Sequence, residues 1–162
     1  MNIERDRGTS RRVWLRLPLL LLAASTFGGS LWALPFPRSF YDDFPIPGWG
    51  WVSALGPYNE HLVRDYGAMN LALGVLLISA ALFLDRRLVQ VALLTYLAFA
   101  APHLLFHVTQ IHHFSALHNA LQLGTLGFLA ALPPVLLALS RRDFEDVRDE
   151  AARKPVGQRR KA

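Results

Sequence analysis

Histidine is the residue type in this sequence best suited to chemistry, and its distribution along the chain is uneven. Besides His61, five histidines lie between positions 103 and 118: His103, His107, His112, His113 and His118. His103 and His107 are four residues apart, so on a helix they share one face, with Cβ atoms about 6 Å from each other. Neutral imidazoles at this spacing suit Zn²⁺ or Cu²⁺. These two histidines are the first candidates for a ligand site.

Other polar residues recur at one-turn spacing on neighbouring predicted helices. One helix starts with ionisable residues one turn apart, followed by an amide: Glu60, His61, Arg64, Asp65 and Asn70. A later helix carries a polar stripe at i, i+4 and i+7, which consists of His118, Gln122 and Thr125. Such patterns direct side chains of one helix to a common face.

Four apolar segments must position these residues. They cover about 13–34, 66–84, 88–107 and 116–139, and a bilayer core about 30 Å thick needs roughly 20 helical residues. Their Leu and Ala content favours helices over the alternating pattern of a membrane β-barrel. The sequence therefore predicts an all-α transmembrane four-helix bundle over 13–139, with short connections that give up-down-up-down topology.

The basic residues predict the orientation of this bundle. Five Lys or Arg residues lie within 1–16, two at 86–87 and eight after 139, against two in the segment 35–65 and none in 108–116. By the positive-inside rule, both termini are cytoplasmic, in a bacterial cytoplasmic membrane. Residues 1–12 then form a basic cytoplasmic N-terminus and 140–162 a charged cytoplasmic tail. We expect the tail to lie near anionic lipid of the bilayer and not to bind nucleic acid.

The connection 35–65 is expected to form a compact cap outside the bilayer. It is rich in aromatic residues, which favour the headgroup zone, and in prolines, which prevent a long helix. Asn59 is a candidate N-cap for a helix that begins before the hydrocarbon does. Within the bundle, Gly67 with Gly74 and Ala120 with Gly124 are candidate sites of close helix packing.

This topology brings the polar residues together near the outer end of the bundle. Since polar groups inside a membrane usually face the protein interior, we expect one polar ligand-binding cluster formed by Glu60, His61, Arg64, Asp65, Asn70, His103, His107, His118 and Gln122. A metal site would use His61, His103, His107 and His118. Three roles of the cluster stay open. It could tie the cap to the bundle by hydrogen bonds, bind a metal or haem, or form a cavity for a lipid-like or quinone-like ligand or for proton exchange.

Several classes of function lack their residues in this sequence. There is no cysteine, which excludes disulfides and iron–sulfur clusters within the chain. Leu104 follows His103 where the metalloprotease motif has Glu. No catalytic triad motif or phosphate-binding loop stands out, so we expect no catalytic residues.

Three functions remain as hypotheses. The first is a non-enzymatic accessory or interaction component, with a membrane-protein partner or a second copy of itself as its partner. The second is a redox-associated membrane protein that binds a metal, haem or quinone through the outer histidines. The third is a small proton-linked transporter, which would need to oligomerise for alternating access.

Residues 60–74, EHLVRDYGAMNLALG, are similar to the start of the second helix in DoxX-like small membrane proteins. There, a turn with acidic residues or Arg leads into a Gly-x-x-x-Leu-Ala-x-Gly pattern. The resemblance implies four membrane helices with short hairpins and a link to quinone-associated redox chemistry. Thiol chemistry, also linked to that group, has no residue to support it here, and the histidine-rich segment 102–118 is not part of the family pattern.

Overall fold

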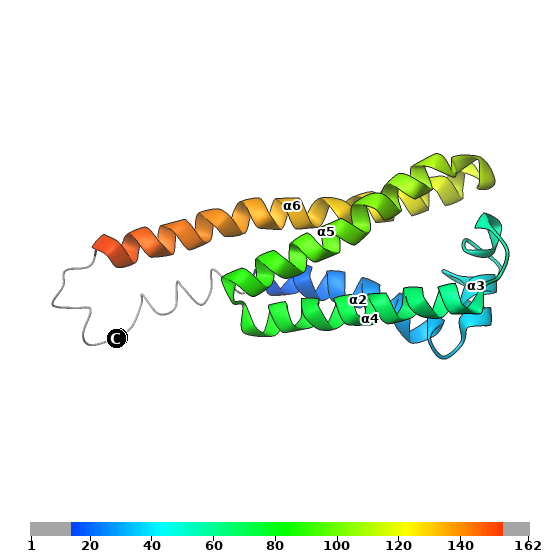
Figure 1. The fold of residues 1–162 in the computed structure, drawn as a ribbon. Helices are drawn as coiled ribbons and strands as arrows, with labels where there is room; N and C mark the ends of the chain where they lie inside the picture. The colour runs from blue at the N-terminus through cyan, green and yellow to red at the C-terminus, as the bar shows by residue number, and fades with distance from the viewer. Residues whose placement is uncertain (1–13, 154–162) are drawn as a thin grey trace.

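The computed structural model describes residues 14–153, with side chains through residue 140. In this part of the chain there are five α-helices and no strand, as the composition predicts (Figure 1). The helices are α2 (Arg16–Ala33), α3 (Pro37–Asp43), α4 (Glu60–Phe83), α5 (Arg86–Thr109) and α6 (Ala116–Arg153), with short 3₁₀ turns η1 (Ser53–Leu55) and η2 (Ile111–His113). The predicted cytoplasmic N-terminus 1–12 and the last part of the predicted tail lie outside the described residues.

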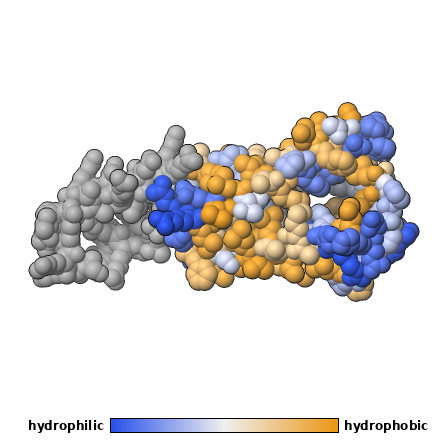
Figure 2. All heavy atoms as spheres, in the orientation of Figure 1, coloured by the Kyte–Doolittle hydropathy of each residue, from blue (hydrophilic) through white to orange (hydrophobic). Residues whose placement is uncertain are grey.

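Three of these helices are long and apolar enough to cross a membrane, namely α4, α5 and the Ala116–Ser140 part of α6. A fourth span is reached when α2 and α3 are taken together, although the two are bent by 116° at the break between them. The space-filling view has a broad apolar band between two hydrophilic regions (Figure 2). The chain thus has the helices of a multi-pass membrane protein.

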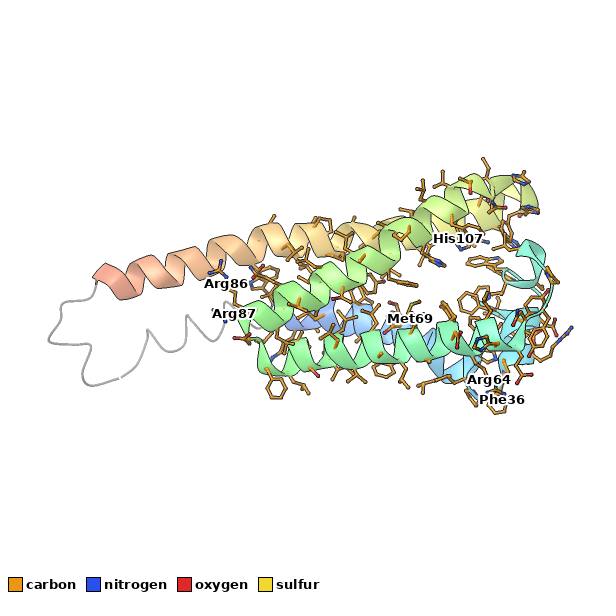
Figure 3. The ribbon with its side chains drawn as sticks, in the orientation of Figure 1. Phe36, Arg64, Met69, Arg86, Arg87 and His107 are labelled. Carbon is orange, nitrogen blue, oxygen red and sulfur yellow. The ribbon has the colours of Figure 1, made fainter. Side chains whose placement is uncertain are left out.

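The connections of the bundle lie at its two ends (Figure 1). The segment with α3 and η1 joins α2 to α4 at one end, which we call the cap end, and η2 joins α5 to α6 at the same end. The short α4–α5 connection lies at the opposite end, which we call the turn end, where Figure 3 labels Arg86 and Arg87.

Local capping explains where α4 and α5 begin. Asn59 is the N-cap of α4, and its side-chain oxygen accepts a hydrogen bond from the Leu62 backbone N–H at 3.1 Å. This confirms Asn59 as the predicted N-cap. Helix α4 starts at Glu60, six residues before the apolar run that begins at 66. At the turn end, Leu84 adopts a left-handed conformation with φ 50°. Asp85 then caps α5 by accepting from the N–H groups of Arg87 and Leu88.

Close packing of α2 against α4 depends on glycines, as the small-residue pattern predicts for Gly67 and Gly74. A Cβ added at Gly74 would lie 2.8 Å from Thr26 Oγ1 and from Phe27 Cε2, and one added at Gly67 would lie 2.9 Å from Leu34 Cγ. Backbone approach at these points supplies van der Waals contact that larger side chains would prevent.

The second small-residue prediction is wrong. A Cβ added at Gly124 of α6 would meet no atom within 4 Å, so the predicted pair of Ala120 and Gly124 is not a site of close packing. A small side chain permits close approach only where a neighbouring helix lies opposite it.

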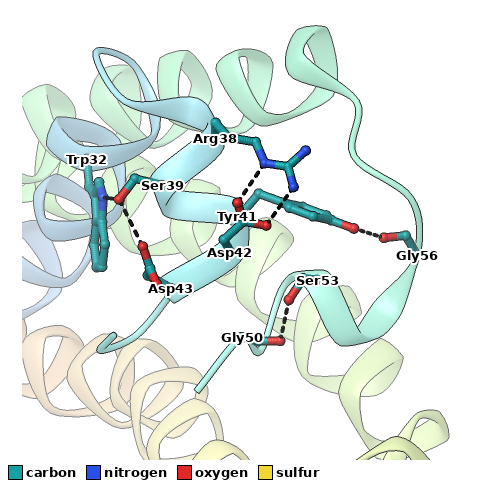
Figure 4. A network of polar contacts seen from close by, with 9 residues as sticks. All are labelled: Trp32, Arg38, Ser39, Tyr41, Asp42, Asp43, Gly50, Ser53 and Gly56. Carbon is teal, nitrogen blue, oxygen red and sulfur yellow. Dashed lines mark hydrogen bonds and ion pairs between the residues drawn. The ribbon is translucent and has the colours of Figure 1, made fainter. Parts of the chain in front are cut away.

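The cap is held by its own polar and aromatic contacts (Figure 4). Arg38 donates to both carboxylate oxygens of Asp42, at 2.6 and 3.1 Å, which raises the pKa of the Arg38 guanidinium. The same guanidinium lies over the rings of Tyr41 and Tyr58, at 5.6 and 4.9 Å. The Tyr41 hydroxyl donates to the Gly56 carbonyl at 2.5 Å. These contacts fold 37–58 back over the cap end, as expected of a compact cap.

The glycine contact gives a stability prediction. We expect Gly74→Ala to lower the free energy of unfolding by about 1–3 kcal/mol, because its Cβ overlaps Thr26 and Phe27. Thermal unfolding in a mild detergent measures this effect. Gly124→Ala is the matched control, and its stability should equal that of the wild type or slightly exceed it, since Ala favours a helix. Equal melting temperatures for both variants would contradict the packing described for α2 and α4.

Candidate functional site

A cavity of about 550 Å³ lies at the cap end, between the helices and beneath the cap. We call it the chamber. All four long helices and the cap contribute to its lining. The space-filling view has a hollow at this end of the molecule (Figure 2). The residues that line the chamber and matter below are Phe40, Trp51, Tyr66, Asn70, Tyr96, Phe99, His103, His107, Gln122 and Thr125.

The chamber exists because the cap-end half of α5 does not pack into the core. The buried residues of α5 are Val89, Ala92, Leu93, Tyr96 and Ala100, and they end at Ala100. Beyond this point α5 diverges from α4 and continues alongside α6 (Figure 1). Tyr96 therefore forms the floor of an open space, with its hydroxyl 3.4 Å from Ser25 Oγ of α2.

His107 and Gln122 form the polar centre of the chamber. His107 Nδ1 lies 2.8 Å from Gln122 Oε1, and Figure 3 places His107 on the side of α5 that faces α4. Gln122 is only 3% exposed, and its Nε2 has no hydrogen-bond partner among the described residues.

The pair offers the same chemistry whichever way the Gln122 amide is turned. If Oε1 accepts from His107 Nδ1–H, the amide N–H₂ remains as a donor and His107 Nε2 as an acceptor. With the amide reversed, its N–H₂ donates to His107 Nδ1. The amide carbonyl oxygen then remains as the free acceptor and His107 Nε2–H as the free donor. In both arrangements one donor and one acceptor of the pair are left without a partner within the pair.

His103 continues this face of α5 toward the floor. Its ring stacks on Phe99 with centroids 5.2 Å apart and meets the edge of the His107 ring at 4.8 Å. The i, i+4 prediction for His103 and His107 thus corresponds to two adjacent rings that both line the chamber.

Trp51 adds a second unpartnered donor, contributed by the cap. Its indole Nε1 is buried without a hydrogen-bond partner among the described residues, and Trp51 lines the chamber. The neighbouring Trp49 stacks on His118 at 4.8 Å and 22°. His118 therefore holds the cap against the start of α6 and is not among the residues that line the chamber.

One side of the chamber's aromatic wall comes from α3 and α4. Tyr66 stacks on Phe40 with centroids 5.4 Å apart. Asn70 is buried one turn further, and its Nδ2 donates to the Tyr66 carbonyl at 3.0 Å. Tyr66 and Asn70 both line the chamber.

The four charged or titratable residues predicted at the start of α4 lie outside the chamber. Glu60 pairs with Arg64 at 2.8 Å, and Arg64 also donates to the Leu34 carbonyl. His61 and Asp65 pair at 3.3 Å with side chains 84% and 63% exposed. Because i, i+4 spacing puts both pairs on the surface of α4, they do not point into the chamber, and Arg64 alone links α4 to the end of α2.

The predicted metal-binding histidines are not gathered at one point. His103 and His107 are adjacent, whereas His61 pairs with Asp65 and His118 stacks on Trp49. Among the described residues there is no group of three or more His, Asp or Glu side chains arranged to hold a metal ion.

Two groups of lining residues were not predicted. The sequence predicts Trp51 in the cap but not in the site, and it does not predict Ser25 and Thr26 of α2 as lining residues. The signal for the α2 residues was the adjacent hydroxyl pair in the middle of an apolar run. The position of Trp51 has no such signal, because it depends on how an irregular loop folds.

Comparison with protein-family models, curated proteins and solved structures gives no match to this chain. The similarity to DoxX-like proteins therefore stays a prediction.

The unpartnered indole gives a test that separates a binding role from a structural one. We expect Trp51→Phe to leave the unfolding free energy of the ligand-free protein less affected than Trp32→Phe. Trp32 Nε1 donates to Ser39 Oγ at 3.2 Å, and loss of a hydrogen bond costs about 0.5–1.5 kcal/mol. Chemical or thermal unfolding of both variants measures the difference. A larger loss for Trp51→Phe would mean that its N–H stabilises the empty protein.

Proposed function

We propose that this chain is a non-enzymatic membrane component that binds an uncharged, oxygen-bearing ring lipid of the quinone class in the chamber. The Gln122 amide is the observation that carries the proposal. It is almost fully buried, yet one of its polar atoms has no partner among the described residues. An unpaired buried donor costs about 1–3 kcal/mol, which a carbonyl oxygen of a ligand would recover.

The charge of the lining supports an uncharged ligand. Of the described residues that line the chamber, none is Asp, Glu, Lys or Arg. A phosphate or carboxylate head would bury its charge without a counter-ion, at a large desolvation cost. A quinone or quinol oxygen needs only the donor and acceptor that His107 and Gln122 present.

The walls of the chamber support a flat ring. Phe40, Tyr66, Tyr96 and Phe99 line it together with Trp51 of the cap, and aromatic side chains pack favourably against other rings. The volume of about 550 Å³ lies within the range of small-molecule pockets.

The metal and haem hypotheses have less support. The candidate histidines are divided between three locations, and no carboxylate accompanies His103 and His107 among the described chamber residues. An interaction role with a membrane-protein partner or a second copy is compatible with ligand binding and stays a hypothesis.

We further propose that the four apolar segments cross a bacterial cytoplasmic membrane in up-down-up-down order, with both termini cytoplasmic and the cap outside. The distribution of Lys and Arg supports this orientation. Alkaline phosphatase fused after Gln110 should then be active, and the same enzyme fused after Arg87 inactive. The reverse pattern would contradict the orientation.

Ligand binding can be measured in lipid nanodiscs through quenching of tryptophan fluorescence by methylnaphthoquinone. We expect saturable binding by the wild type, and binding about three- to tenfold weaker in Gln122→Leu, because one hydrogen bond contributes about 0.5–1.5 kcal/mol.

Gln110→Leu is the matched control for this change. Gln110 lies just beyond α5 at the cap end, where its side chain donates to Thr109, and it does not line the chamber. Its substitution should leave binding unchanged. Non-saturable quenching in the wild type, or equal affinity in both variants, would overturn the proposal.

A further inference from the structure

A second cavity, of about 680 Å³, lies between α4 and α5. We call it the groove. It is lined by Met69, Ala72, Leu73 and Leu76 of α4 and by Thr95, Ala98, Phe99, Pro102 and His103 of α5. Figure 3 places Met69 on the side of α4 that faces α5.

The groove is apolar, and residues on both of its walls are exposed. Met69 is half-exposed, and Ala72 and Ala98 are exposed as well. Thr95 does not make the groove polar, because its hydroxyl donates to the Val91 carbonyl at 2.8 Å within its own helix. In a membrane, this surface would face lipid chains at the depth of the apolar band.

The groove and the chamber share a wall. Phe99 and His103 line both cavities, and their rings stack on each other at 5.2 Å. Two rings therefore separate a polar-centred chamber inside the bundle from an apolar groove at its side. Both rings belong to α5, the helix that diverges from α4 toward the cap end (Figure 1).

The small residues of the groove determine its depth. Ala72 on α4 and Ala98 on α5 are the smallest side chains that line it, and a large residue at either position would fill the space. From Thr95 to His103 the groove follows α5 over eight helical rises, about 12 Å. A groove of this length suits a narrow, flexible chain better than a second ring.

We infer that the ligand is a tailed lipid whose isoprenoid or alkyl chain lies in the groove while its ring lies in the chamber, and that it enters sideways from the bilayer between α4 and α5 past Phe99 and His103. This inference rests on the proposed ring-binding function and adds the tail, its location and the route of access.

The test compares two probes in nanodiscs at equal mole fraction of lipid: methylnaphthoquinone, which has no tail, and its tetraprenyl derivative. We expect the wild type to bind the tailed probe about three- to tenfold more tightly. The preference is modest because a chain that leaves lipid for protein gains packing contacts and no hydrophobic transfer energy.

Ala98→Trp fills the groove without entering the chamber and should abolish this preference, while affinity for the tail-free probe is retained. Ala101→Trp is the matched control on the same helix, since Ala101 is exposed and outside both linings, and it should keep the preference. A preference that persists in Ala98→Trp, or is missing in the wild type, would overturn the groove assignment.

A second measurement needs no variant. A tetraprenyl naphthoquinone with a photoreactive diazirine on the second isoprene unit of its chain should label α4 near Leu76 or α5 near Thr95 in the wild type. Labelling confined to other segments would overturn the inference.

The two proposals can fail separately. If the tail-free probe binds and the tailed probe binds no more tightly, the groove has no role in binding, and the ring-binding role of the chamber stands. If only the tailed probe binds, and Ala98→Trp abolishes its binding, the groove binds the tail and the chamber does not bind the ring. Binding of neither probe removes both.

Discussion

Close packing of α2 against α4 at glycines determines where open space lies in this molecule. Gly67 and Gly74 let the two helices meet without intervening side chains, and the same contact places Tyr66 under Phe40 of the cap. The core that fixes α5 ends at Ala100. Beyond it, α5 and α6 form one wall and the α2–α4 pair with the cap forms the other, and the chamber is the space between them.

The chemistry of the chamber follows both from the polar and aromatic groups in its described lining and from the absence there of Asp, Glu, Lys and Arg. The ion pairs of α4 lie on the surface, where they cost little and contribute little. The lining keeps neutral polar groups, imidazoles, amides and an indole N–H, set among aromatic rings. Two of its donors have no partner among the described residues. A buried donor without a partner is expensive enough that it indicates a ligand or water, and the aromatic walls favour the ligand.

Much of the architecture could be predicted from the sequence, because hydrophobic length and capping residues act locally. The helical class, Asn59 as the N-cap of α4 and the glycine contacts of Gly67 and Gly74 follow from such signals. His103, His107, Asn70 and Gln122 could be predicted as lining residues from helical spacing. Whether His61, Arg64 and His118 face inward depends on the rotation of each helix and on the fold of the cap, which spacing does not determine. The predicted packing site at Gly124 is wrong for the same reason, since a small residue does not specify which helix lies opposite it.

In the function proposed here, a ring lipid occupies the chamber and hydrogen-bonds to Gln122. An experimental structure of the protein in lipid, determined with the tetraprenyl naphthoquinone, tests this most directly. We expect ring density between Tyr66 and Phe99, with an oxygen within hydrogen-bonding distance, about 2.7–3.2 Å, of the Gln122 amide or His107. A structure in which α5 packs against α4 along its whole length and leaves no chamber, or in which the ligand lies only in the surrounding lipid, would contradict it.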